Sequence, residues 1–257
     1  MEISRFSPQR ESVEIDVWTA ALVEKAELWD VPIVPMEALG LSHDEDGFSE
    51  SAEMVPLKTG AEACPYLDHK QRIVYKLFDL RSNGAMGKKI VMQRDAEAGL
   101  CDEIKDAVFQ DTIRKLSAIN DAGGHPTEIV GLVDSFDHLL VKQPLAEPYL
   151  DFDADRREAM DMMRCVTPMG GQFRNPLSVF YIQEEPWLLG DLHKGNIMRD
   201  AEGRPTVIDA LVGYLPPYVL RELPWVGMAA NDAKDFRLTG QAPLRKSLLE
   251  EVEDDEL

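Results

Sequence analysis

The residues of this sequence best suited to chemistry are two aspartates, each after a short apolar stretch, and an asparagine between them. Asp191 follows the apolar stretch 187–190, and Asp209 follows the stretch 206–208. We predict that both stretches are strands. Asn196 lies between them, and the Asp-Ala-Glu-Gly sequence after it is typical of a hairpin turn. The two strands and this turn would bring the three polar side chains together.

Transfer of a phosphoryl group to a hydroxyl needs this set of side chains. One carboxylate orients the hydroxyl and accepts its proton, while carboxylate and amide oxygens hold the Mg²⁺ ions that neutralise charge on the phosphates. Asp191 and Asn196 are five positions apart (196 − 191 = 5), and Asp209 follows 13 positions later (209 − 196 = 13). A surface loop with Asp and Asn as turn formers is the alternative. The apolar stretches on both sides favour a site.

The segment Gly190-Asp191-Leu192-His193-Lys194-Gly195-Asn196 resembles the catalytic loop of the protein-kinase-like superfamily, above all that of its aminoglycoside-phosphotransferase branch. A narrower resemblance, to the kinase domain found in phage and mobile-element polyvalent proteins, covers about residues 54–215. It rests on this loop and on the segments Gly60-Ala61-Glu62, Val74-Tyr75-Lys76-Leu77, Asn120, His125-Pro126, Gln143-Pro144 and Val207-Ile208-Asp209-Ala210.

This resemblance implies an α+β, bilobal protein-kinase-like fold with a β-rich N-lobe and a short, mostly helical C-lobe. It also implies ATP and Mg²⁺ as cofactors and a phosphotransferase, or kinase, activity. Asp191 would be the base or hydroxyl-orienting group, and Asn196 and Asp209 would be metal ligands. Lys76 would contact the phosphates. Lys194 would stabilise charge on the transferring phosphate, unless it is simply an exposed lysine.

Lys76 lies in an apolar stretch, residues 72–78, that we predict to be a strand. A lysine in such a strand is costly without a partner, whereas a phosphate-binding lysine needs that setting. A lysine on the solvent face of the strand is the alternative. Upstream, the backbone around Gly60 is a candidate cover for the nucleotide, although the G-x-G-x-x-G pattern is absent.

Residues 95–119 carry apolar side chains at mostly helical spacing, and we predict one long helix there. In active kinases the strand lysine pairs with a carboxylate on the large helix of the N-lobe. Glu103 is the preferred partner of Lys76, and Glu97 and Asp111 remain alternatives.

The apolar stretch 138–144, with Leu145 after it, takes the place of the last N-lobe strand and the hinge. Hinge backbone groups would hydrogen-bond the adenine edge, which depends on position more than on the type of side chain. Gln143 and Leu145 are therefore positional candidates for nucleotide binding.

Three regions divide the chain. Residues 1–53 are predicted to hold an accessory amphipathic helix, at 12–30, and an acidic linker. Residues 54–145 would form the N-lobe and hinge, and residues 146–257 a reduced C-lobe with an acidic tail. After Asp209, 48 residues remain (257 − 209 = 48), which leaves little room for the long activation segment of eukaryotic-type protein kinases.

Acidic residues dominate the composition. The chain has 47 Asp and Glu against 27 Lys and Arg, a net charge of −20 and a pI near 4.6. Because such a surface repels phosphate backbones and anionic membranes, neither nucleic acid nor a membrane is expected as a partner. Three dispersed cysteines indicate neither a zinc site nor a disulfide framework, and no secretory signal pattern is present. We expect a globular, cytoplasmic protein.

The acceptor of the phosphoryl group stays open between a protein Ser/Thr and a small molecule. The sequence also departs from the protein-kinase pattern, because Leu189-Gly190 replaces His-Arg before Asp191 and Ala210-Leu211 replaces Phe-Gly after Asp209. Two alternative functions remain: a nucleotide-binding pseudokinase that acts as an interaction module, and an enzyme of the same fold that transfers AMP.

Overall fold

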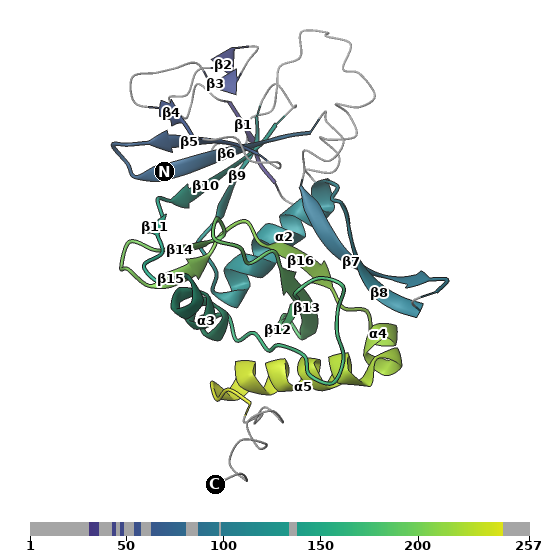
Figure 1. Ribbon diagram of the computed structural model, residues 1–257. Coiled ribbons are helices and arrows are strands. Elements are labelled where there is room, and N and C mark those ends of the chain that lie inside the picture. The colour runs from purple at the N-terminus through teal and green to yellow at the C-terminus, as the bar shows by residue number, and fades with distance from the viewer. Residues whose placement is uncertain are drawn as a thin grey trace, which may run out of the picture.

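The computed structural model describes residues 31–35, 43–44, 47–48, 54–57, 63–80, 87–97, 99–133 and 138–243. The helix predicted for residues 12–30, the acidic tail at 250–257 and Gly60 lie outside these ranges. Within them the chain mixes α and β structure, as predicted, with one larger sheet, smaller strand groups and helices α2 to α5 (Figure 1).

A six-stranded sheet forms the upper part of the molecule in Figure 1, in the order β1-β9-β10-β6-β5-β4. Its strands are β1 (Ile33–Val34), β4 (Met54–Pro56), β5 (Cys64–Asp68), β6 (Ile73–Asp79), β9 (Glu128–Val133) and β10 (His138–Pro144). All neighbouring pairs are antiparallel except β1 and β9. The strands predicted for residues 72–78 and 138–144 are confirmed as β6 and β10, which pair at the centre of the sheet.

Two three-stranded sheets lie below. One has the order β12-β13-β16, and the other β11-β14-β15. Their strands are β12 (Ser178–Ile182), β13 (Glu185–Gly190), β16 (Leu211–Tyr214), β11 (Glu147–Pro148), β14 (Ile197–Arg199) and β15 (Pro205–Val207). Two-residue strands β2 (His43–Asp44) and β3 (Gly47–Phe48) pair with each other. The strands predicted before Asp191 and Asp209 are present as β13 and β15.

Four helices occur in the described ranges. They are α2 (Phe109–Ala122), α3 (Phe152–Met162), α4 (Pro217–Glu222) and α5 (Pro224–Thr239), and α5 runs beneath the lower sheets in Figure 1. The ends of the longer helices follow local rules. The Asp151 carboxylate accepts the N–H groups of Asp153 and Ala154 at the start of α3. Gly123 and Gly240, with φ of 92° and 72°, end α2 and α5 in the left-handed conformation.

The prediction of one long helix over residues 95–119 is wrong for the first half of that range. An antiparallel hairpin of β7 (Lys88–Asp95) and β8 (Gly99–Asp106) stands there, and α2 begins only at Phe109. Leu100 and Ile104 are four residues apart, which fits one face of a helix. In the hairpin Leu100 is half-buried while Ile104 is exposed, so the apolar spacing does not mark a common buried face.

Tertiary contacts explain why the hairpin forms. Ile90 of β7 packs directly on the backbone of Gly213 in β16, where an added Cβ would lie 2.3 Å from the Ile90 carbonyl oxygen. Asp102 of β8 is buried, and its carboxylate accepts the backbone N–H of Arg174 at 2.6 Å and that of Asn175 at 3.1 Å. These long-range contacts override the local helical preference.

Helix α2 packs against both halves of the molecule. Its N-terminal part contributes Phe109, Ile113 and Leu116 to the hydrophobic core of the upper sheet. Its C-terminal part contributes Ile119 and Ala122 to the core of the lower sheets. One helix is therefore shared between two cores.

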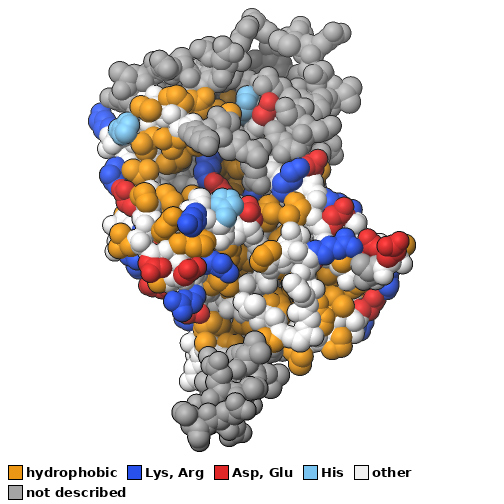
Figure 2. Space-filling view, in the orientation of Figure 1, with side chains coloured by type: hydrophobic (Ala, Val, Ile, Leu, Met, Phe, Trp, Pro, Cys, Tyr) orange, Lys and Arg blue, Asp and Glu red, His pale blue; other side chains and the backbone are white. Residues whose placement is uncertain are grey.

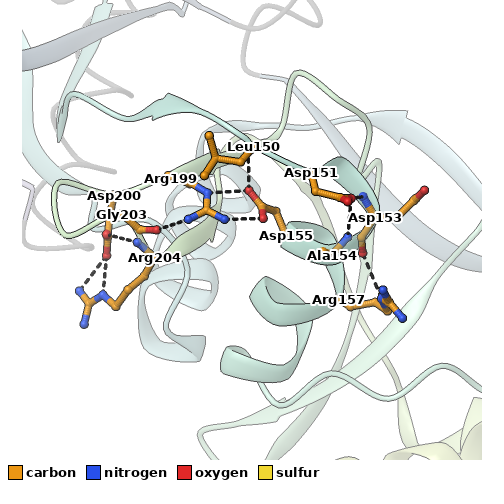
Figure 3. A network of polar contacts seen from close by, with 10 residues as sticks. All are labelled: Leu150, Asp151, Asp153, Ala154, Asp155, Arg157, Arg199, Asp200, Gly203 and Arg204. Carbon is orange, nitrogen blue, oxygen red and sulfur yellow. Dashed lines mark hydrogen bonds and ion pairs between the residues drawn. The ribbon is translucent and has the colours of Figure 1, made fainter.

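A polar network fastens α3 to the β14–β15 hairpin (Figure 3). Arg199 of β14 donates Nε and Nη2 hydrogen bonds, of 2.7 and 2.6 Å, to the two carboxylate oxygens of Asp155. The Leu150 N–H donates to the same carboxylate at 3.0 Å, and Arg199 Nη1 donates to the Gly203 carbonyl at 2.6 Å. The Arg199 guanidinium holds the pKa of the Asp155 carboxyl below its ordinary value of 3.8.

Replacing Asp155 by Asn should lower the midpoint of thermal unfolding by at least ~3 °C at pH 7, because the Arg199 pair is broken in a buried position. A carboxyl with a depressed folded pKa stabilises the protein fully above its unfolded pKa, and this contribution is lost as the pH falls through the folded pKa. Calorimetry should therefore show the two proteins converging below about pH 4. Asp153→Asn, an exposed position on the same helix, serves as the control and should change little. A constant difference at all pH values would contradict the ion-pair explanation.

Candidate active site

A cleft of 580 Å³ separates the six-stranded sheet from the structure below it. Strands β5 and β6 line it above, and residues of the segments 191–198 and 208–211 line it below. Figure 2 shows a hollow with basic and acidic side chains beneath the hydrophobic surface of the upper part. The volume lies in the range of ligand pockets in proteins.

The residues predicted for phosphate contact, hydroxyl orientation and metal binding, which are Lys76, Asp191, Asn196 and Asp209, all line this cleft. Lys76 Nζ donates to Asp209 Oδ1 at 2.5 Å, across the cleft from β6 to the segment after β15. The lysine side chain is 8% exposed and the aspartate side chain 44%. Burial makes the partner necessary for the ammonium, while the carboxylate stays open to the cleft.

The predicted helix carboxylates do not pair with Lys76. Glu103 lies on β8, not on a helix, and its carboxylate is 3.2 Å from Lys105. Asp111 lies in the first turn of α2 but accepts a 2.7 Å bond from Lys89. Glu97 sits in the turn between β7 and β8. The carboxylate partner of Lys76 is instead Asp209.

Asn196 is buried and held by its amide nitrogen. Nδ2 donates to the Asp191 carbonyl at 2.8 Å, to Asp191 Oδ2 at 3.4 Å and to the Asp209 carbonyl at 3.3 Å. The Ile208 N–H also donates to the Asn196 carbonyl at 2.9 Å. Since the nitrogen faces these three acceptors, the amide oxygen is the atom left for a ligand. Asn196 and Asp209 thus offer one amide and one carboxylate oxygen, which suit a hard cation.

Both cleft aspartates adopt a left-handed backbone conformation. The φ of Asp191 is 60° and that of Asp209 is 51°. Residues with a Cβ avoid this region, and Asp and Asn enter it more readily than most others. The two residues follow strands β13 and β15, and this conformation redirects the chain after each strand.

The loop after Asp191 orients its side chains in different directions. His193 Nδ1 accepts the Gly195 N–H at 2.9 Å, which leaves the proton on Nε2, 3.8 Å from Asp191 Oδ1. His193 also lines the cleft. Lys194 does not line the cleft; its ammonium lies 5.9 Å from the centre of the Phe152 ring. The structure therefore separates Lys194 from the other predicted site residues.

Residues 143–146 line one side of the cleft where β10 ends. Gln143 is buried, and its Nε2 donates to Thr127 Oγ1 at 2.6 Å. The Leu145 N–H donates to the Arg72 carbonyl at 2.7 Å, so it is already used within the protein. Gln143 and Leu145 are both at the cleft wall, as positional candidates for a ligand.

His125 and Lys88 line the cleft but were not among the predicted site residues. His125 is buried, and its Nε2 donates to the Pro144 carbonyl at 2.8 Å, because a carbonyl can only accept. Burial lowers the pKa of this histidine, so it is neutral at pH 7. The His-Pro pair after Gly123-Gly124 was its only signal. Lys88, on β7 and paired with Asp106, also lines the cleft, and it lies before the range that was predicted to be helical.

Comparisons with protein-family models, with curated proteins and with solved structures find no match. In the described residues, no helix is long and apolar enough to span a membrane. The same residues contain no group of three or more His, Cys, Asp or Glu side chains that could hold a metal. A Mg²⁺ site that shares its ligands with phosphate oxygens needs only one or two protein ligands, which Asn196 and Asp209 can supply.

Asp191→Ala should lower the free energy of unfolding by about 1 kcal/mol more than Asp191→Gly, because alanine is strained at a φ of 60° and glycine is not. Asp191→Asn should fall between them, since Asn enters this region more readily than Ala. Urea unfolding of the three variants measures the order. Equal stability of the alanine and glycine variants would show that the backbone relaxes and that no strain is held there.

Proposed function

We propose that this chain is an ATP- and Mg²⁺-dependent phosphotransferase of the protein-kinase-like superfamily, which moves the γ-phosphoryl group to a hydroxyl. The observation that carries the proposal is the meeting of Lys76, Asp191, Asn196 and Asp209 in one cleft. These are the residue types that the resemblance of the loop 190–196 predicts for phosphate contact, hydroxyl orientation and metal binding. The absence of any match leaves the proposal to rest on the residues themselves.

The arrangement of strands supports a bilobal organisation. Strands β4, β5 and β6 form a meander, and β10 lies between β6 and β9. The chain leaves β10 at Pro144 and passes along the cleft wall to β11. In our proposal the six-stranded sheet is the core of an N-lobe (54–145), the segment after Pro144 is the hinge, and 146–257 form a reduced C-lobe.

The contacts of each side chain fit a role in transfer. Lys76 would exchange Asp209 for phosphate oxygens, and the Asp209 carboxylate and Asn196 amide oxygen would hold Mg²⁺. Bound Mg²⁺ would neutralise charge on the phosphoryl group. Asp191, whose side chain is 43% exposed, is open to an incoming hydroxyl and would orient it and accept its proton. The acceptor, a protein Ser/Thr or a small molecule, is reached from this open side.

The hinge offers backbone groups for the base. The Pro144 carbonyl already accepts one hydrogen bond from His125 and can accept a second, because a carbonyl oxygen has two lone pairs. The Ala146 N–H lies two residues further along the cleft wall. In our proposal these two backbone groups bind the donor and the acceptor of the adenine edge. Gln143 and Leu145 would then enclose the base.

One observation favours a second candidate, a nucleotide-binding module without transfer activity. Helix α2 has two acidic residues, Asp111 and Asp121, and their hydrogen bonds go to Lys89 and Gln183. Lys76 therefore lacks the helix carboxylate that holds the equivalent lysine in active kinases and binds a proposed metal ligand instead.

Asp191→Asn should reduce Mg²⁺-dependent ATP turnover, or autophosphorylation followed by mass spectrometry, at least ~100-fold, because the amide cannot accept the proton. ADP affinity should change less than ~3-fold, since Asp191 is proposed to contact the acceptor. Asp153→Asn, an exposed position that does not line the cleft, is the matched control. Wild-type protein that binds ATP but transfers nothing to itself or to a generic protein acceptor would favour the binding module. Failure to bind any nucleotide would remove the cleft assignment altogether.

Asp209→Asn should separate metal-dependent from metal-free binding. With Mg²⁺ present, the ATP dissociation constant should rise about tenfold, because a carboxylate ligand is lost. In EDTA the same variant should bind ATP at least as tightly as wild type, because Lys76 is released from its ion pair. Lys76→Met should weaken binding in both conditions. Titration calorimetry measures all four cases, and a Mg²⁺-independent loss in Asp209→Asn would contradict the metal-ligand role.

A further inference from the structure

The turn between α2 and β9, residues 123–127, is hydrogen-bonded both to the six-stranded sheet and to the strands below it. His125 in this turn is 1% exposed and lines the cleft. Its backbone N–H donates to the Val207 carbonyl in β15 at 3.0 Å, and its ring Nε2 donates to the Pro144 carbonyl at the end of β10 at 2.8 Å. Strand β10 belongs to the six-stranded sheet and β15 to a sheet below it. One buried residue is therefore hydrogen-bonded to both sides of the cleft.

A second connection joins the same turn to the end of β10. Gln143 Nε2 donates to Thr127 Oγ1 at 2.6 Å, and Thr127 Oγ1 donates to the His125 carbonyl at 3.1 Å. Because Gln143 precedes Pro144 in the chain, these contacts and the bond from the His125 ring form a closed ring of hydrogen bonds, which we call the polar ring. A buried network whose hydrogen bonds are made in this way holds its members in one arrangement.

The two places that His125 connects have different roles in our proposed function. Pro144 would bind the base, whereas Val207 lies two residues before Asp209, the proposed metal ligand. Val207 is fully buried in the hydrophobic core of the lower sheets, so its carbonyl is a fixed point for the turn. A displacement of the end of β10 relative to β15 would change the distance between the base site and the metal ligand. The hydrogen bonds of His125 oppose such a displacement.

The second ring nitrogen of His125 argues against a purely stabilising role for this side chain. With the proton on Nε2, Nδ1 is an acceptor, and it is buried without a hydrogen-bond partner among the described residues. A buried polar atom without a partner lowers stability. An aromatic ring without nitrogen would avoid this loss of stability. The hydrogen bond to Pro144 is therefore what a histidine adds at this position.

We propose that His125 is a positioning residue, which fixes the distance between the base-binding wall at Pro144 and the metal ligand Asp209. This inference rests on the proposed function, which assigns the base and the phosphates to these two places. A nucleotide must reach both places at once, and joining two contacts in one ligand raises affinity only when their spacing matches the ligand. Adenosine or a polyphosphate alone reaches only one place. Loss of the spacing should therefore weaken binding of the whole nucleotide and spare its parts.

Titration calorimetry of the full-length chain with Mg²⁺-ATP, adenosine and Mg²⁺-tripolyphosphate tests this inference, and displacement of ATP gives the constants of weakly bound ligands. His125→Phe keeps an aromatic ring but removes the donor to Pro144. Its dissociation constant for ATP should rise at least ~10-fold, while those for adenosine and tripolyphosphate should change less than ~3-fold. His125→Gln, whose amide can again donate to the Pro144 carbonyl, should recover most of the ATP affinity.

Thr127→Val opens the polar ring at a second position without changing a residue that lines the cleft. It should raise the dissociation constant for ATP at least ~3-fold and leave those for the two parts unchanged. The matched controls are His69→Phe and Thr239→Val, at exposed positions that do not line the cleft, and neither should alter any of the three constants. Thermal unfolding reports whether the variants fold. If His125→Phe does not fold, Thr127→Val decides alone.

Three results would overturn the inference and leave the proposed function standing. The first is an equal loss of affinity for ATP and tripolyphosphate in His125→Phe, because the whole cleft would then be damaged. The second is a loss for ATP and adenosine alone, because His125 would then act only on the base site. The third is an unchanged ATP affinity in both His125→Phe and Thr127→Val. Wild-type protein that binds none of the three ligands would instead remove the proposed function, and this inference with it.

Discussion

The ion pair between Lys76 and Asp209 joins the two walls of the cleft and sets a demand on the rest of the structure. Lys76 is buried in the central strands of the upper sheet, and an ammonium in that position needs an anion within hydrogen-bond distance. The anion comes from a segment 133 residues further along the chain. The six-stranded sheet and the strands below it must therefore keep one relative position, because otherwise Lys76 would be buried without a partner.

The lower wall meets this demand through a compact hairpin. Ile197 and Val207 are opposite each other in β14 and β15, and both are fully buried. Arg199, the last residue of β14, is fastened to α3 through Asp155. Asn196 and Asp209 follow the packing of this hairpin because they flank it on either side. Apolar packing and one polar network thus fix the hairpin that carries these two side chains.

The local part of the site could be predicted from the sequence. Asp191, Asn196 and Asp209 belong to strand and turn patterns within a short stretch, and such patterns are readable where neighbours in sequence are neighbours in space. The strand with Lys76 was also readable from its apolar residues. The position of Lys194 was not, because the spacing of residues in an irregular loop does not indicate which side of the loop a side chain occupies.

The rest of the site could not be predicted from the sequence, because it depends on strand pairing and contacts between residues far apart in the chain. Glu103 was placed on a helix because Leu100 and Ile104 have helical spacing, but the hairpin is selected by contacts with residues far along the chain, such as Gly213 and the loop that binds Asp102. Those contacts leave no mark in the local pattern. The same error explains why a helix carboxylate was predicted as the partner of Lys76. In the structure the acidic residues of that stretch do not line the cleft, and Asp209 is the partner.

The sharing of α2 between two cores has a mechanical consequence. A rotation of the upper sheet about residues 145–146 would have to pull α2 away from one of the two apolar surfaces that bury it. Separation of packed apolar surfaces is costly, so a wide clamshell movement is disfavoured. The edge of the six-stranded sheet lacks such packing. Strand β4 is the last strand of the sheet, and Val55 and Leu57 are exposed there. Entry of molecules into the cleft should therefore depend on the loosening of this sheet edge, while α2 stays packed in both cores.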